Sequence, residues 1–133
     1  MLVDRLRDDE MNGKVRSAAP GSDADPTLQA LDALAEALEQ IADDRQVLVK
    51  KIEELRRSRR KGLAWQEILV EEDGPGSMQV VSRMLACLSK ASGTLRKELV
   101  EELREEGATI PAIARLFGVT HQRVSNLLRR SPE

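Results

Sequence analysis

The chain has 133 residues, of which 41% are hydrophobic and 33% charged, and its formal net charge of −2 indicates no class of partner. Trp65 and Phe117 are the only aromatic residues, so an interior must be built from aliphatic side chains, which favours helices over sheet. We therefore expect an all-α protein. Because no apolar run has the length of a signal peptide or a membrane span, we also expect it to be cytoplasmic.

Residues 1–26 mix charged with small and turn-forming residues and predict a disordered arm. Residues 27–61 then predict one long coiled-coil helix, with Asp25 or Thr27 at its start and Gly62 at its end. Its apolar residues repeat in heptads, and seven of the eight a and d positions are apolar. These eight positions, which we predict to form a homodimer interface, are Leu31, Leu34, Leu38, Ile41, Arg45, Leu48, Ile52 and Leu55.

The charges along this helix change sign, because acidic residues gather in its first half and basic residues in its second. Antiparallel pairing would place opposite charges against each other, so we expect the antiparallel arrangement. Alanines and Val49 at flanking positions widen the apolar face and also permit packing in a bundle. Arg45 either extends to solvent or pairs with an acid of a partner helix, or else it sets the register of the pair.

Residues 62–76 predict a short amphipathic helix and a linker. Trp65 in this segment is either a core anchor or a residue that stacks on a ligand, and a small-molecule effector would fit a pocket around it. A basic cluster precedes the segment and either lies in solvent at the helix end or forms an extra phosphate or anion contact. Its members are Arg56, Arg57, Arg59, Arg60 and Lys61.

Residues 77–133 predict a second, helical domain. Apolar spacing from Ser77 onward predicts helix as far as Gly107, with a break at "SGT", residues 92–94. We interpret Cys87 as a core residue. As the single cysteine it excludes an intrachain disulfide, which fits a reducing compartment.

The segment "TIPAIARLFGVTHQRVSNLLRR", residues 109–130, predicts two short helices joined by a tight turn. Thr109 and Thr120 stand where each helix needs an N-cap. Gly118 permits the positive φ that the turn requires, and Ala114 is small where the second helix crosses the first.

Ala114, Gly118 and Val124 stand where the helix-turn-helix family of DNA-binding domains has its three diagnostic residues. "GVTHQRVSNLL" is also similar to the turn and recognition helix of sigma-factor region 4 and of small response-regulator domains. The resemblance covers roughly the last 40 residues and leaves out the coiled coil. It implies a sequence-specific transcription regulator, or a nucleoid-associated DNA binder, whose second helix enters the major groove and whose long helix forms the dimer.

Charge supports this interpretation. Residues 109–133 carry four arginines and one glutamate, a charge of +3, so the residues before them carry −5. The predicted base contacts are Thr120, His121, Gln122, Arg123, Ser125 and Asn126. The predicted phosphate contacts are Thr109, Arg115, Arg129 and Arg130. His121 is either such a contact or simply an exposed helix residue.

Two other functions compete with DNA binding at the nucleoid. In the second hypothesis the coiled coil is the working surface of an adaptor that binds a sigma factor or polymerase, with the helix-turn-helix as a retained scaffold. An enzyme is the third hypothesis, but no paired carboxylates, phosphate-binding loop or metal cluster support it. One histidine and one distant cysteine make no metal site, so we expect neither a metal nor a cofactor.

Overall fold

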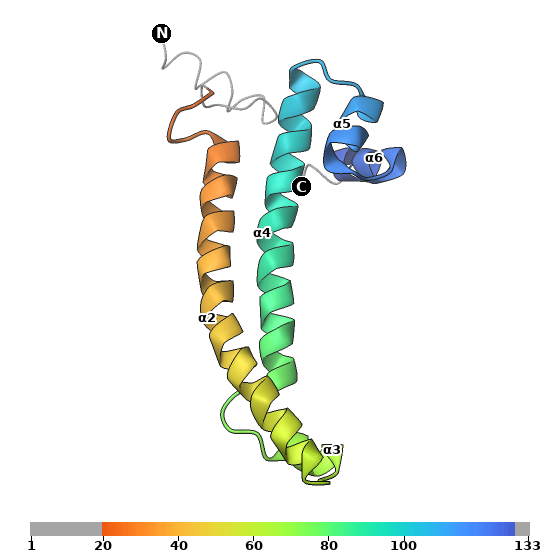
Figure 1. The fold of residues 1–133 in the computed structure, drawn as a ribbon. Helices are drawn as coiled ribbons and strands as arrows, with labels where there is room; N and C mark the ends of the chain where they lie inside the picture. The colour runs from red at the N-terminus through yellow and green to blue at the C-terminus, as the bar shows by residue number, and fades with distance from the viewer. Residues whose placement is uncertain (1–19, 130–133) are drawn as a thin grey trace. The chain divides into compact units, whose positions relative to one another are not determined.

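The computed structural model describes residues 20–129 as helices joined by short turns (Figure 1). In chain order the helices are α2 (Pro26–Arg60), α3 (Trp65–Val70), α4 (Ser77–Glu105), α5 (Ile110–Phe117) and α6 (His121–Arg129). No strand occurs among these residues, so the all-α expectation is confirmed for them. Within the same range, none of the helices has the length and apolar character needed to cross a membrane. Residues 1–19 of the expected arm, and Arg130, lie outside the described residues.

The ends of α2 follow from the residues that flank it. The Asp25 carboxylate accepts hydrogen bonds from the backbone N–H groups of Thr27 at 2.8 Å and Leu28 at 3.4 Å, which have no partner within the first turn. At the other end Gly62 adopts a φ of +91°, and the N–H of Leu63 donates to the Ser58 carbonyl at 3.4 Å. The helix therefore begins and ends where capping chemistry is available.

The described residues form two compact units. We call residues 34–91 the hairpin unit, and residues 20–33 together with 92–129 the terminal unit. Because α2 and α4 contribute to both, each unit is described by itself.

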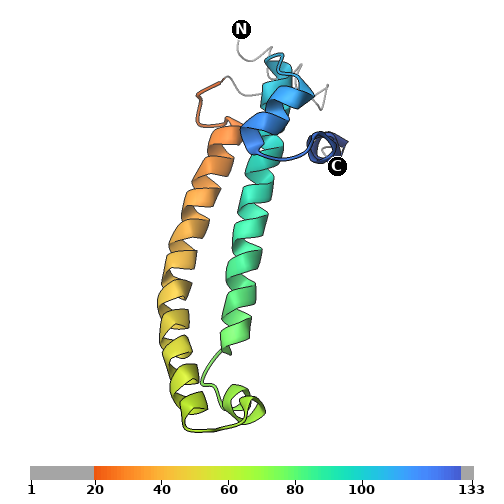
Figure 2. The same ribbon diagram turned by 45° about the vertical axis from the view of Figure 1, so that its right-hand side comes forward.

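In the hairpin unit, α2 and α4 run side by side in opposite directions, as both views show (Figures 1 and 2). Ala37 lies beside Cys87 and Asp44 beside Arg83, so residue numbers rise along one helix while they fall along the other. Buried and half-buried residues of α2 follow a heptad spacing toward α4. This inner seam consists of Leu34, Ala37, Ile41, Asp44, Leu48, Lys51 and Leu55.

The inner seam uses only half of the expected dimer positions. Its members include all the d positions from Leu34 onward, but the a positions Leu38, Arg45 and Ile52 are exposed. The reason is that α2 packs against α4 of its own chain, and small Ala37 next to the d positions lets the two helices approach closely. Leu31, the first a position, belongs to the terminal unit and is exposed as well.

Two sequence expectations are wrong. Helix α4 does not break at residues 92–94 but continues through Gly93 to Glu105. Glycine costs about 1 kcal/mol there relative to alanine, and fully buried Val80 and Val100 on either side keep the helix packed. Trp65 is not a core anchor, because it is 47% exposed at the start of the six-residue helix α3, with the Arg59 guanidinium 5.1 Å from its ring centroid.

Candidate nucleic-acid interface

A small buried group of side chains holds α5 and α6 against the end of α4. Val100, Ile113 and Val124, one from each helix, are 0% exposed, and Ala114 is nearly so. The partly buried residues packed around these four are Leu103, Ala108, Ile110, Phe117, Val119, Leu127 and Leu128. We call these eleven residues the C-terminal cluster. Burying one such aliphatic side chain is worth roughly 1.5–3 kcal/mol, so the cluster fixes the two short helices.

The turn between α5 and α6 depends on Gly118. Its φ of 68° and ψ of 34° place it in the left-handed region, where a side chain is disfavoured. The N–H of Gly118 donates to the Arg115 carbonyl at 3.3 Å, and the N–H of Val119 donates to the Ala114 carbonyl at 3.0 Å. These bonds close the end of α5, as expected for a glycine at this position.

Both predicted threonine caps are confirmed. The Thr109 hydroxyl accepts a hydrogen bond from the Ala112 N–H at 3.2 Å at the start of α5. The Thr120 hydroxyl accepts one from the Arg123 N–H at 3.1 Å at the start of α6. Each satisfies an amide that has no partner in the first turn. Sequence analysis missed Arg104, which donates to the Ala108 carbonyl at 2.9 Å and ties α4 to the segment that leads into α5.

The structure brings all six predicted base contacts together on α6 and its cap. Thr120, His121, Gln122 and Arg123 are exposed, whereas Ser125 and Asn126 are half-buried. Val124, Leu127 and Leu128 face the cluster, so the helical repeat places Gln122, Asn126 and Arg129 at the centre of the opposite face.

These three central side chains are already bonded to one another. The Gln122 side-chain N–H donates to the Asn126 amide oxygen at 3.1 Å, and Arg129 donates to the same oxygen. The bonds order the side chains before any ligand is present. A bidentate contact of Asn126 with adenine uses its amide oxygen as well as its amide nitrogen, so it would replace one of these bonds.

The exposed charged side chains of α5 and α6 are all positive. Arg115 on α5 and Arg123 and Arg129 on α6 are exposed, and residues 107–129 contain no aspartate or glutamate. Thr109 is also exposed, although its hydroxyl oxygen is engaged in the cap. A surface with several cations and no acid suits a polyanion.

The other basic cluster, at the end of α2, is partly occupied by its own neighbours. Arg56 forms an exposed ion pair with Glu53 at 2.9 Å. Arg59 donates to the Leu63 carbonyl at 2.9 Å and covers the Trp65 ring. Arg57, Arg60 and Lys61 are exposed. For Arg56 and Arg59, these contacts favour the interpretation of a solvated helix end over a phosphate contact.

The hairpin unit has a hollow of about 300 Å³, but it does not surround Trp65. Its walls include Lys51, Leu55 and Ile68, together with the acidic side chains of Glu54, Glu67, Glu71, Glu72 and Asp73. A second hollow of about 340 Å³, beside Leu69, Gly74 and Met78, does not include Trp65 in its walls either. Among the residues that the structure describes, no group of three or more His, Cys, Asp and Glu side chains is arranged to hold a metal ion.

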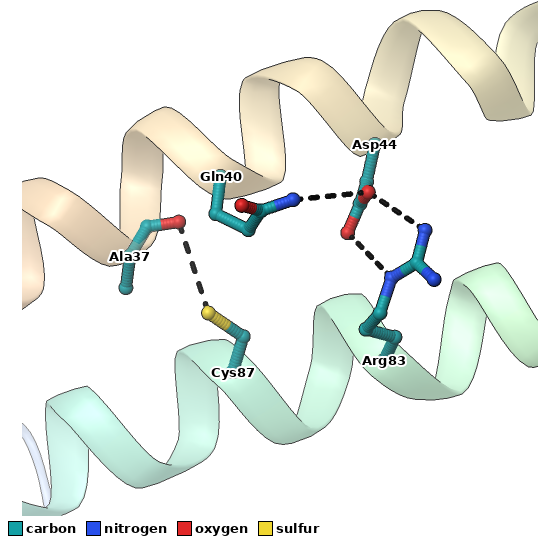
Figure 3. A network of polar contacts seen from close by, with 5 residues as sticks. All are labelled: Ala37, Gln40, Asp44, Arg83 and Cys87. Atoms are coloured by element: carbon teal, nitrogen blue, oxygen red, sulfur yellow. Dashed lines mark hydrogen bonds and ion pairs between the residues drawn. The ribbon is translucent and has the colours of Figure 1, made fainter.

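Sequence analysis also missed a polar contact inside the hairpin unit (Figure 3). The Asp44 carboxylate, almost fully buried, accepts two hydrogen bonds from Arg83, at 2.8 and 3.1 Å, and one from Gln40 at 3.4 Å. The hydrogen bonds from Arg83 hold the pKa of Asp44 below its usual range, although burial opposes this shift. The signal in the sequence was a second heptad repeat, in which Asp44 lies seven residues after Ala37 and seven before Lys51.

Comparisons with family models, curated proteins and solved structures return no match to this chain.

Proposed function

We propose that this protein is a sequence-specific DNA-binding transcription regulator or a nucleoid-associated DNA binder, in which α5 and α6 act as a helix-turn-helix. The observation that carries the proposal is the division of α6 into two faces. Its apolar side is closed by the C-terminal cluster, and its other side presents amides and arginines without an acid. That combination leaves a rigid polar helix surface available to the major groove.

The roles of the side chains follow from their chemistry. Gln122 and Asn126 suit bidentate contacts with adenine, and Arg123 suits guanine. Arg115 and Arg129 carry the charge for phosphates. One such helix contacts few base pairs, so useful affinity requires two copies, and we propose a homodimer that includes α2.

The direct test measures binding of purified full-length protein to duplexes selected from a random pool at physiological salt. Each bidentate contact is worth about 1–3 kcal/mol, so Arg123→Ala with Asn126→Ala should weaken binding on the order of 100-fold. The matched control is Gln46→Ala with Lys50→Ala, which removes one exposed amide and one exposed cation from α2 and should leave affinity unchanged. If the variant with Arg123→Ala and Asn126→Ala binds as tightly as the wild type, the proposed DNA-binding surface is wrong.

The salt dependence separates phosphate contacts from base contacts. Each phosphate contact adds about 0.9 to the slope of log affinity against log salt, so Arg129→Gln should lower that slope by about 1 on every sequence. The adaptor function is the other outcome of these experiments. It replaces the proposal if the protein ignores duplex DNA and binds a purified sigma factor or polymerase subunit instead.

A further inference from the structure

The hairpin unit leaves large apolar side chains uncovered. Seven of those on α2 and α4 are between 38% and 64% exposed: Val47, and a group of six with three on each helix. The six are Leu38, Val49 and Ile52 on α2, and Met78, Leu85 and Leu88 on α4. Single exposed apolar residues are ordinary, but a contiguous group of this kind marks an interaction surface.

These six residues lie on one side of the hairpin. Each of them directly follows a buried or half-buried residue that faces the other helix, as Leu38 follows Ala37 and Leu88 follows Cys87. One residue turns a helix by about 100°. Since the helices face each other and run in opposite directions, the same step turns both toward the same side. We call this side the outer face.

The opposite side of the hairpin has a different character. The residues that directly precede the inward-facing ones are mostly polar or charged. They include Gln40, Asp43, Lys50 and Glu54 on α2, and Gln79, Arg83 and Lys90 on α4, all of them exposed. Val47 is the large apolar exception there, at 41% exposed. The polar side chains on this side are suited to contact with solvent, whereas the apolar side chains of the outer face are not.

The outer face also carries a charge that points to its occupant. Arg45 lies in the middle of the apolar row of α2, and among residues 20–129 it forms no ion pair. Glu39, at the edge of the same face, is likewise exposed without an ion pair among these residues. A two-fold interface makes each residue meet its partner's counterpart reciprocally, so a second copy can offer Glu39 to Arg45 twice.

We propose that the outer face binds the outer face of a second copy of this chain, giving a four-helix bundle with α2 antiparallel to α2 of its partner. Pairing Arg45 with Glu39 in both directions places the two-fold axis beside Ala42, the small residue midway between them. The pairs Ala37–Cys87 and Asp44–Arg83 align α4 with α2, and in this alignment Leu85 of α4 lies level with Ala42 of α2. The axis therefore brings two copies of Leu85 together.

This assignment rests on the dimer in the proposed function, but it does not rest on DNA binding. It also resolves the roles of the heptad positions: the d positions pack within the chain, and the a positions Leu38, Arg45 and Ile52 pack between chains. Arg45 then sets the register of the pair.

Sedimentation velocity of the full chain tests the proposal. The wild type should sediment as a dimer of the 14.8 kDa chain. Leu85→Glu places two like charges at the axis and should weaken dimerisation on the order of 100-fold. Val47→Glu makes the same kind of change on the opposite side and should leave the dimer intact. Circular dichroism of each variant checks that its helices still form.

A charge exchange tests the register. Arg45→Glu and Glu39→Arg should each weaken the dimer on the order of tenfold, and the double variant should recover most of the loss. In a Cys87→Ser background, Ala42→Cys should form a disulfide between copies under mild oxidation, whereas Val47→Cys should not.

The outcomes are distinguishable. A monomeric wild type overturns both this proposal and the dimer, while DNA binding by α6 is measured separately. A dimer that Leu85→Glu leaves unchanged overturns the outer face alone. A dimer that Leu85→Glu breaks, but that neither the charge exchange nor Ala42→Cys affects as expected, overturns the axis beside Ala42.

Discussion

The C-terminal cluster and the hairpin unit differ in how completely their apolar side chains are buried. Val100, Ile113 and Val124 are wholly withdrawn from solvent, whereas Leu85 and Met78 remain more than half exposed. Both regions are helical and both show apolar residues at helical spacing, so the difference lies in how many sides of each helix find a partner. A region that has buried most of its apolar residues offers a mainly polar surface to a ligand, and one that has not still lacks a partner for its apolar side.

The two regions also differ in what their interiors contain. The C-terminal cluster is entirely apolar, whereas the inner seam includes Asp44 and Lys51. Lys51 reaches the Asp73 carbonyl at 2.8 Å, and Asp44 pairs with Arg83. A seam with polar members gains less from burial but accepts fewer alternative alignments.

The largest expected effect comes from truncation inside the C-terminal cluster. Ile113→Ala should cost about 2–5 kcal/mol, because it leaves a cavity where no solvent reached before. Leu116→Ala on the same helix should cost less than about 0.5 kcal/mol, since that side chain is 70% exposed. Hydrogen exchange of the α5 and α6 amides measures both. Similar losses for the two variants would contradict the contrast drawn between closed and open apolar sides.

Two glycines with open space around them should respond with opposite signs. A Cβ at Gly118 or at Gly93 would meet nothing within 4 Å. Gly118→Ala should destabilise by about 1–2 kcal/mol, because its φ of +68° is left-handed. Gly93→Ala should stabilise α4 by about 1 kcal/mol, because the backbone there is ordinary helix. Urea unfolding measures both changes, and the same sign for both would refute this explanation.

Loss of one cap should loosen α6 without touching the cluster. Thr120→Ala removes the oxygen that accepts from the Arg123 N–H and should cost about 1 kcal/mol. Thr120→Ser keeps that oxygen and should behave like the wild type. The readout is amide exchange at the start of α6. Protection that is equal in the alanine and serine variants would show that the cap contributes nothing.

The smallest expected effect is a loss of hairpin stability in acid. The folded pKa of Asp44 lies below its normal value of about 3.9, so its pair with Arg83 contributes stability above that pH and loses it as pH falls through the folded pKa. The effect is small because the Arg83 side chain is 49% exposed and solvent screens it. Thermal unfolding between about pH 2 and about pH 6 should show this slope in the wild type and less of it in Asp44→Asn. An unchanged slope in that variant would assign the acid sensitivity to other groups.

Structural features that depend on residues close by in the chain could be predicted from the sequence. Gly118 at the turn and the caps Thr109 and Thr120 were predictable, because each satisfies or permits a backbone geometry within a few residues of itself. Gly62 and Gly107 adopt positive φ just after α2 and α4 for the same reason. The division of α6 into an apolar and a polar side also follows from its spacing alone. Whether that polar side binds DNA stays a prediction.

Structural features that depend on packing against a distant part of the chain could not be predicted from the sequence. Helix α2 has two apolar rows, and nothing local determines which row faces α4. Gly93 looked like a helix break because its cost is local, whereas the packing that outweighs it comes from Val80 and Val100 many residues away. Trp65 looked like an anchor because of its size, but the short helix α3 gives it no surface to pack beneath.

The position of Trp65 has a practical consequence for spectroscopy. The chain has one tryptophan and no tyrosine, so its fluorescence arises from a single side chain beside Arg59, where α3 begins. Emission from this indole therefore reports on the α2–α3 turn. If the emission of the full chain shifts when duplex DNA is added, the environment of this turn has changed, either because DNA contacts the neighbouring basic cluster or because binding at α6 alters the hairpin unit.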